Sequence, residues 1–305
     1  MRIFDLHCDT LCRCVGTGEK LLKNAGQLDL TRDIRTEGWV QTFACFVSNR
    51  QKGEEAVQAF EAMRRVLADT LEESPDKIAL WQPGSQPQRG ICSAVLAVEG
   101  GQALGGNIEN VARMKELGVA FLTLVWNGDN ELASGGVGGM DRGLTDFGKE
   151  CLREMNRVGI VPDISHLNDK GIADVFACSG APVMATHSNL RSVCGHPRNL
   201  TEEQFRFLVE NGGVCGLNFY PAFINRESDY TPDDFRRHLD RMLSLGGEHT
   251  VALGSDFDGA EMPSFLKGVE SLYILYGHVV EWYGEKVADQ LFYQNAADFA
   301  ARSLG

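Results

Sequence analysis

Eight short apolar runs recur along the chain, and stretches with helical periodicity separate them. The runs are rich in Val, Ile, Leu, Phe and Thr, and most are continuously apolar rather than alternating, which is typical of strands covered on both faces. They span residues 2–7, 40–47, 91–98, 120–125, 160–164, 183–186, 213–219 and 250–254. Helical patterns cover 54–71, 110–117, 145–158, 201–208, 231–245 and 285–301. This alternation predicts an α/β fold, a (β/α)8 TIM barrel.

An open, doubly wound sheet is the alternative arrangement for such a pattern. Its nucleotide-binding version needs a Gly-x-Gly-x-x-Gly turn after the first strand, and the chain has none there. The proline-containing segment 74–90 is predicted to be an irregular connection. Since no internal repeat or linker interrupts the pattern, we expect residues 1–305 to form a single barrel domain.

Charge and cysteine content exclude several classes of function. The formal net charge is −13, which disfavours nucleic acid as a partner. No polybasic cluster, apolar signal core or membrane-spanning run is present, so we expect no membrane association and a cytoplasmic location. The nine cysteines are odd in number and irregularly spaced, which favours reduced thiols over a disulfide framework.

Polar side chains suited to chemistry follow the predicted strands. In a barrel the carboxyl ends of all strands meet on one face, where barrel enzymes carry their active sites. Residues far apart in the chain are therefore expected to meet in one pocket. They are His7, Asp9, Glu99, Asn127, His166, His187, Asn218, Tyr220, Asp256 and Asp258.

Five of these residues form a candidate two-metal site. His7 and Asp9 are two apart on a strand, so both can face the barrel mouth. Glu99 ends a very apolar strand; a salt bridge to an Arg would explain it, but its two oxygens could also join two metals. His166 and His187 would each be an ordinary core histidine alone, and beside the others they become candidate ligands.

Two divalent ions joined by a carboxylate would generate hydroxide at neutral pH and polarise a carbonyl group. That chemistry suits hydrolysis of an amide or an ester. A serine nucleophile is not indicated, because the chain has no Gly-x-Ser-x-Gly elbow.

At this point the motifs resemble a known family over nearly the whole chain. The chain is similar to the membrane (renal) dipeptidase family, peptidase family M19, in its shorter soluble bacterial members. The motifs occur in the family's order: Asp5-Leu6-His7-Cys8-Asp9, Ala97-Val98-Glu99-Gly100-Gly101, Leu122-Thr123-Leu124-Val125-Trp126-Asn127, Asp163-Ile164-Ser165-His166, Thr186-His187-Ser188-Asn189, Arg198-Asn199-Leu200, Gly216-Leu217-Asn218-Phe219-Tyr220 and Gly254-Ser255-Asp256-Phe257-Asp258-Gly259.

The resemblance implies a barrel of the metal-dependent hydrolase type with two Zn²⁺ ions. His7, Asp9 and Glu99 would hold one ion, and Glu99 with His166 and His187 the other. A hydroxide between the ions would attack the peptide bond of a dipeptide. The resemblance also implies that Arg198 binds the substrate carboxylate and that Asp256 faces its amine and assists proton transfer, while Asp258 is structural.

The chain departs from the family pattern at Trp126, where some members carry a His that contacts the substrate and the developing oxyanion. Asn127 could donate a hydrogen bond there instead, and Tyr220 is a further substrate-binding candidate.

The expected function is therefore zinc-dependent dipeptide hydrolysis. The alternative is a metal-dependent amidohydrolase acting on N-acyl amino acids, lactones or cyclic amides. A third hypothesis is a non-catalytic binding protein on the same scaffold. The nitrogen and oxygen ligands suit Mn²⁺ and Co²⁺ as well as Zn²⁺, and the resemblance is compatible with a homodimer.

Overall fold

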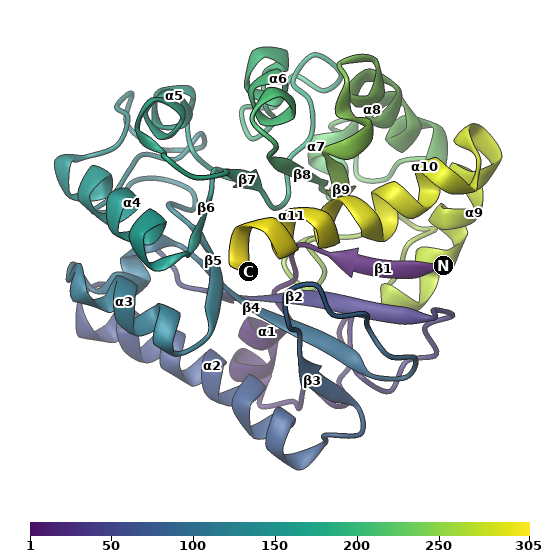
Figure 1. Cartoon of the computed structure of the whole chain (residues 1–305), viewed down its shortest axis with the longest axis horizontal. Coiled ribbons are helices and arrows are strands. Elements are labelled where there is room, and N and C mark those ends of the chain that lie inside the picture. The colour runs from purple at the N-terminus through teal and green to yellow at the C-terminus, as the bar shows by residue number, and fades with distance from the viewer.

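The computed structural model describes all 305 residues, and eight of its strands form a closed parallel barrel (Figure 1). Each strand pairs in parallel with the next, and pairing of Asp5 with Leu253 closes the ring. The fold class predicted from the apolar runs is confirmed. The barrel strands are β1 (Arg2–Asp5), β2 (Gly38–Phe46), β4 (Cys92–Glu99), β5 (Val119–Thr123), β6 (Val161–Asp163), β7 (Met184–Ala185), β8 (Val214–Leu217) and β9 (Val251–Leu253).

A ninth strand lies where an irregular connection was predicted. β3 (Ile78–Leu80) pairs with Cys92–Ala94 at the start of β4, whereas β5 pairs with β4 only from Leu96 onward. β4 is longer than β5, so its first residues leave an edge that β3 occupies. The prediction of irregular structure was wrong here because only Ile78 of the strand is buried, which leaves almost no apolar pattern.

Helices surround the barrel, and five of them match predicted helical segments to within a few residues. The predicted capping box is present, since the Thr201 hydroxyl accepts from the Gln204 backbone and the Gln204 side chain accepts from the Thr201 backbone. The helices α1, α5, α7 and α9 were not predicted. The surrounding helices are α1 (Thr10–Thr17), α2 (Glu54–Glu73), α3 (Glu109–Glu116), α4 (Asp146–Val158), α5 (Asp169–Cys178), α6 (Glu202–Glu210), α7 (Pro221–Ile224), α8 (Pro232–Ser244) and α9 (Leu272–Tyr283), with short 3₁₀ turns at Gly101–Leu104, Gly247–His249 and Val269–Ser271.

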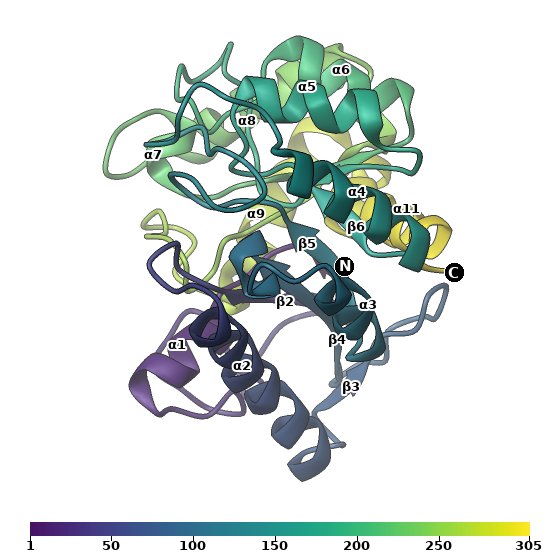
Figure 2. The same cartoon turned by 90° about the vertical axis from the view of Figure 1, so that its left-hand side faces the viewer.

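The amino ends of the strands, which we call the base of the barrel, are covered by the last helical segment. The predicted helix 285–301 is divided into α10 (Glu285–Asp289), a π-helical turn (Gln290–Gln294) and α11 (Asn295–Leu304). In Figure 1 α11 crosses the barrel, and in Figure 2 α11 and α7 lie on opposite sides of the molecule. Tyr293 and Phe299 pack with the interior barrel residues Phe4 and Phe121 in one apolar cluster. The opposite end, which we call the mouth, is left for the site.

No helix of the structure combines the length and the apolar character that crossing a bilayer requires.

Candidate metal centre

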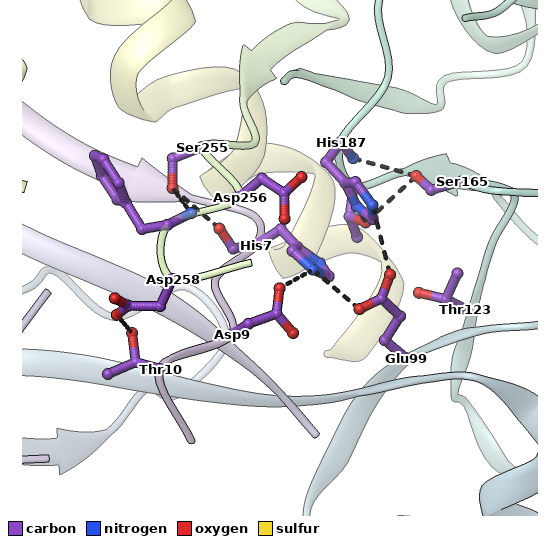
Figure 3. Close-up of polar contacts among 12 residues, drawn as sticks. His7, Asp9, Thr10, Glu99, Thr123, Ser165, His187, Ser255, Asp256 and Asp258 are labelled. Carbon is purple, nitrogen blue, oxygen red and sulfur yellow. Dashed lines mark hydrogen bonds and ion pairs between the residues drawn. The ribbon is translucent and has the colours of Figure 1, made fainter. Parts of the chain in front are cut away.

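The five candidate metal ligands lie together at the mouth, each at or just after the carboxyl end of a strand. Figure 3 labels four of them, His7, Asp9, Glu99 and His187. Glu99, the last residue of β4, lies between the three imidazoles. One of its oxygens, Oε1, is 2.8 Å from His166 Nε2 and 3.7 Å from His187 Nε2. The other, Oε2, is 3.5 Å from His7 Nε2. This geometry matches a carboxylate that divides its oxygens between two groups of ligands.

Asp9 completes the group around His7. Its Oδ2 atom is 3.3 Å from His7 Nε2, and ligand atoms of His7, Asp9 and Asp256 all lie within 4.8 Å of one another. The same holds for His7, Glu99 and His187. The candidate ligand sets therefore overlap at His7, and Asp256 lies close enough to join one of them.

The unmet bonding capacity of these residues fits divalent metal ions. His7 Nε2 and Asp9 Oδ1 are buried and have no hydrogen-bond partner. Buried polar atoms are rarely left so, because each unsatisfied one costs about 1–3 kcal/mol. Imidazole nitrogens and carboxylate oxygens are the donor set that zinc, manganese and cobalt accept.

The pKa values of the three imidazoles are shifted in different directions by their surroundings. Burial alone would lower the pKa of His7, but the charges of Glu99 and Asp9 outweigh it and raise that pKa well above its usual value. Burial lowers the pKa of His166 to about 4, with Arg198 adding repulsion, and it holds the pKa of His187 well below its usual value. The neighbouring carboxylates therefore favour the protonated form of His7, whereas burial favours the neutral form of the other two rings.

Asp256 follows β9 and faces this group. Its backbone is left-handed, with φ 65°, and its Oδ2 atom accepts a 2.8 Å hydrogen bond from the Asn218 side chain. Burial, together with the nearby Asp9 and Glu99 carboxylates, raises the pKa of Asp256 to about 7. A Cβ atom at Gly259 would overlap both Asp9 Oδ2 and Asp256 Oδ1, so only glycine leaves room for these two carboxylates.

Arg198 is a buried cation without a carboxylate partner. It is 4% exposed, its Nη2 donates to the His187 carbonyl at 3.3 Å, and its Nε has no partner. Its guanidinium carbon lies 5.3 Å from the centre of the Phe223 ring. Burial lowers the pKa of Arg198 to about 10, which leaves it charged at neutral pH. A buried guanidinium that has no carboxylate partner is suited to bind an anionic ligand.

A cavity of about 530 Å³ opens over the candidate ligands. Asp9, Glu99, His166 and Asp256 form part of its lining. Phe46 and Trp126 line it as well, with ring centres 4.9 Å apart in an edge-to-face arrangement.

The other predicted substrate residues lie outside the cavity lining. Asn127 directs its side-chain oxygen toward His166 Nδ1, at 3.4 Å. The Tyr220 ring packs edge-to-face on Phe223, with ring centres 4.9 Å apart. Arg198 lies behind His187. Asp256 is thus the one predicted substrate residue in the lining itself.

Three residues of the site had no assigned task in the sequence-based prediction, which named Asn218 only as a polar residue expected in the pocket. Phe46 lines the cavity, Asn218 holds Asp256, and Gly259 makes room for two carboxylates. Asn218 and Gly259 belong to motifs of the resemblance, which is a usable signal, whereas Phe46 resembles any other apolar strand residue. Asp258 accepts hydrogen bonds from the Thr10 hydroxyl at 2.6 Å and the Gln27 backbone at 2.7 Å, as a structural residue would.

Known proteins resemble this chain along its length. The model of the family described as membrane dipeptidase (peptidase family M19) matches residues 1–297. An uncharacterised dipeptidase of Schizosaccharomyces pombe is 31% identical over 270 residues, which is 80% of this chain. The match spans 63% of the yeast protein.

Two solved structures are similar over both whole chains. Dipeptidase AC, a metallopeptidase of family M19, is 28% identical with a TM-score of 0.91, and the match covers 100% of this chain and 99% of that one. A metallopeptidase from Rhodobacter sphaeroides, liganded with a phosphinate mimic of the dipeptide L-Ala-D-Ala, is 26% identical with a TM-score of 0.90, and the match covers 99% of each chain.

Proposed function

We propose that this chain, which belongs to the membrane dipeptidase family (peptidase family M19), is a zinc-dependent dipeptidase. The observation that carries the proposal is the position of Arg198. This buried cation has no carboxylate partner and donates a hydrogen bond to the His187 carbonyl. It lies close enough to the candidate ligands that, beyond the effect of burial, its charge lowers the pKa values of His166 and His187. A substrate with a free carboxylate close to its scissile bond would satisfy both features.

The metal ions would be held by His7, Asp9 and Glu99 on one side and by Glu99, His166 and His187 on the other. Bound divalent ions acidify a water molecule and polarise a carbonyl oxygen, the two requirements of amide hydrolysis. Glu99 would contribute to both ligand groups, because one of its oxygens faces His7 and the other faces His166.

The remaining side chains bind and orient the dipeptide. Arg198 would receive the carboxylate in a charge-assisted hydrogen bond. Asp256, whose side chain is held by Asn218, would face the amino group and exchange a proton with the leaving nitrogen. Anchoring both termini limits the substrate to two residues, which distinguishes a dipeptidase from a general peptidase.

Trp126 would present an aromatic face where some family members have His. Together with Phe46 it makes one side of the cavity apolar. We therefore expect dipeptides with an apolar side chain to be the better substrates. A D-residue at the second position belongs in the test, because the Rhodobacter sphaeroides relative binds a mimic of L-Ala-D-Ala.

The test is a rate comparison with zinc-loaded protein whose metal content is confirmed by elemental analysis. The panel holds L,L and L,D dipeptides, the same dipeptides as C-terminal amides, and N-acetyl amino acids. The proposal predicts the highest kcat/KM for free dipeptides, a loss for the amides because Arg198 is left unpaired, and a loss for the N-acetyl compounds because Asp256 has no amine to bind. Faster turnover of N-acyl amino acids, lactones or cyclic amides would establish the amidohydrolase alternative. No turnover by metal-loaded protein would rule out hydrolysis.

A further inference from the structure

Asp163, at the end of β6, is a fully buried carboxylate that joins three neighbouring strands. Its Oδ1 atom accepts from the backbone N–H groups of Ser165 and Thr186, both at 2.9 Å. Its Oδ2 atom accepts from the hydroxyls of Thr123 at 2.5 Å and Thr186 at 2.6 Å. Four donors therefore surround a group that, when ionised, can only accept. Thr123 ends β5 and Thr186 follows β7, so one carboxylate ties the strand ends beside the metal centre.

The Thr186 hydroxyl also touches a candidate metal ligand. Its oxygen is 2.7 Å from His187 Nδ1. A hydroxyl carries one hydrogen, and here Asp163 accepts it, so the Thr186 oxygen is left to accept a hydrogen from Nδ1. His187 is thereby held in the tautomer with the proton on Nδ1. The Nε2 lone pair then points toward His166 Nε2, 2.9 Å away, and toward Glu99.

We propose that Asp163 is a positioning residue of the metal centre, acting through Thr186 to keep His187 in the tautomer and orientation that bind metal. The inference rests on the metal site of the proposed function. Partners of this kind behind a metal-binding histidine are worth about 10- to 100-fold in metal affinity, because they fix the ring and raise its basicity.

The other candidate ligands lack this relay. His166 Nδ1 has only the more distant Asn127 oxygen, at 3.4 Å. Asp5, below His7, is also fully buried and also accepts backbone and side-chain hydrogen bonds, from Ser255 and Gln41, but it contacts no imidazole ring. Asp163 is thus the one of these two buried carboxylates that is linked through a hydroxyl to a ligand ring.

The chain offers a matched pair of variants for a test. Thr186→Val and Thr123→Val each remove one hydroxyl from the same Asp163 oxygen, and only Thr186 also contacts His187. Zinc affinity is measured by competition with a chromophoric chelator, without substrate. We expect Thr186→Val to bind zinc about 10- to 100-fold more weakly than the parent. Thr123→Val should change affinity much less, and Thr186→Ser, which keeps the hydroxyl, should restore it.

The ¹⁵N chemical shifts of the His187 ring in the metal-free protein give a second readout. They should report the Nδ1–H tautomer in the parent and in Thr123→Val, and a mixture in Thr186→Val. Equal affinity losses in the two valine variants, or an unchanged His187 tautomer in Thr186→Val, would overturn the inference. Should Thr186→Val fail to fold, Asp163→Asn carries the same test, since an amide has one acceptor oxygen and its nitrogen cannot accept from the donors that face the other carboxylate oxygen. A parent protein that binds no zinc would instead contradict the proposed function.

Discussion

Asn295 at the base of the barrel and the candidate ligands at its mouth are buried polar groups in opposite bonding states. At the base, Asn295 donates its side-chain amide hydrogens to the carbonyls of Val251 at 2.7 Å and Glu248 at 2.9 Å, within an apolar surrounding that includes Phe299. At the mouth, His7 Nε2, Asp9 Oδ1 and Arg198 Nε are buried without a hydrogen-bond partner.

The difference separates a polar side chain that stabilises the fold, Asn295, from side chains at the mouth that are available to a ligand. A satisfied polar group contributes to the folded state, whereas an unsatisfied one costs free energy that a bound ligand can return. Substitutions at the two ends should therefore affect different measurements, and the predictions below test that separation.

The largest effect is expected at the mouth, from Glu99→Gln. The amide keeps the shape of the side chain but cannot bind two cations, so several kcal/mol of transition-state stabilisation should disappear. We expect kcat/KM for dipeptides to fall by about 10³-fold or more, with a smaller change in the thermal stability of the metal-free protein. A kcat/KM within tenfold of the parent would contradict the role of Glu99 in binding metal. It would also remove the expected difference between substitutions at the mouth and at the base.

At the base, Phe299→Ala should destabilise the fold and spare the chemistry. Phe299 is 1% exposed and packs with interior barrel residues in the cluster at the base, and truncating such a ring costs about 3–5 kcal/mol. Denaturant unfolding measures the loss, and kcat/KM per folded molecule should match the parent. If zinc affinity fell as well, the base and the mouth would be coupled more tightly than their chemistry suggests.

His238, on α8, sharpens the comparison because it is a fully satisfied histidine outside the metal centre. Its Nδ1 accepts from the Leu190 backbone at 3.2 Å, and its Nε2 lies 3.0 Å from the Ile224 carbonyl. Burial lowers its pKa from 6.5 to about 4.

Since the unfolded chain takes up the His238 proton first as pH falls, the stability due to neutral His238 is complete above pH 6.5. It declines toward pH 4, by about 3 kcal/mol in all. Unfolding measured across this range should show a shallower decline for His238→Gln than for the parent. Parallel curves would mean that His238 titrates normally in the folded protein.

The smallest of these effects is expected for Arg198→Lys. Lysine keeps the charge but loses the planar fork that pairs with a carboxylate, and a hydrogen bond to a charged group is worth about 1.5–3 kcal/mol. We expect kcat/KM for free dipeptides to drop about 10- to 100-fold, mainly through KM. The C-terminal amides serve as the control, because they offer no carboxylate and should lose much less. An equal loss on both substrates would place Arg198 outside the carboxylate site.

The barrel was predictable because its strands are apolar throughout, and the candidate ligands were predictable because they follow those strands. β3 escaped prediction since two of its three residues are exposed. The break between α10 and α11 also escaped, because a π-helical turn keeps the apolar pattern of a helix.

Residues behind the site were harder to identify than those in it. Asp163 and Thr186 lie within recognised motifs, but their function depends on which hydroxyl meets which ring nitrogen. Such contacts join strands that are distant in the chain and have no signature in composition or spacing. Gly259 is similar, because the space it provides is defined by Asp9, 250 residues earlier.

The pairing of β1 with β9 has a consequence for protein synthesis. Asp5 accepts a hydrogen bond from Ser255, and Thr10 donates to Asp258, across 250 and 248 residues of chain. His7 and Asp9 therefore lack their neighbour Asp256 until the segment that bears it has been synthesised and has folded against them. Closing so long a loop is entropically costly and slow. The N-terminal strands alone therefore cannot form the complete candidate centre, however early they are synthesised.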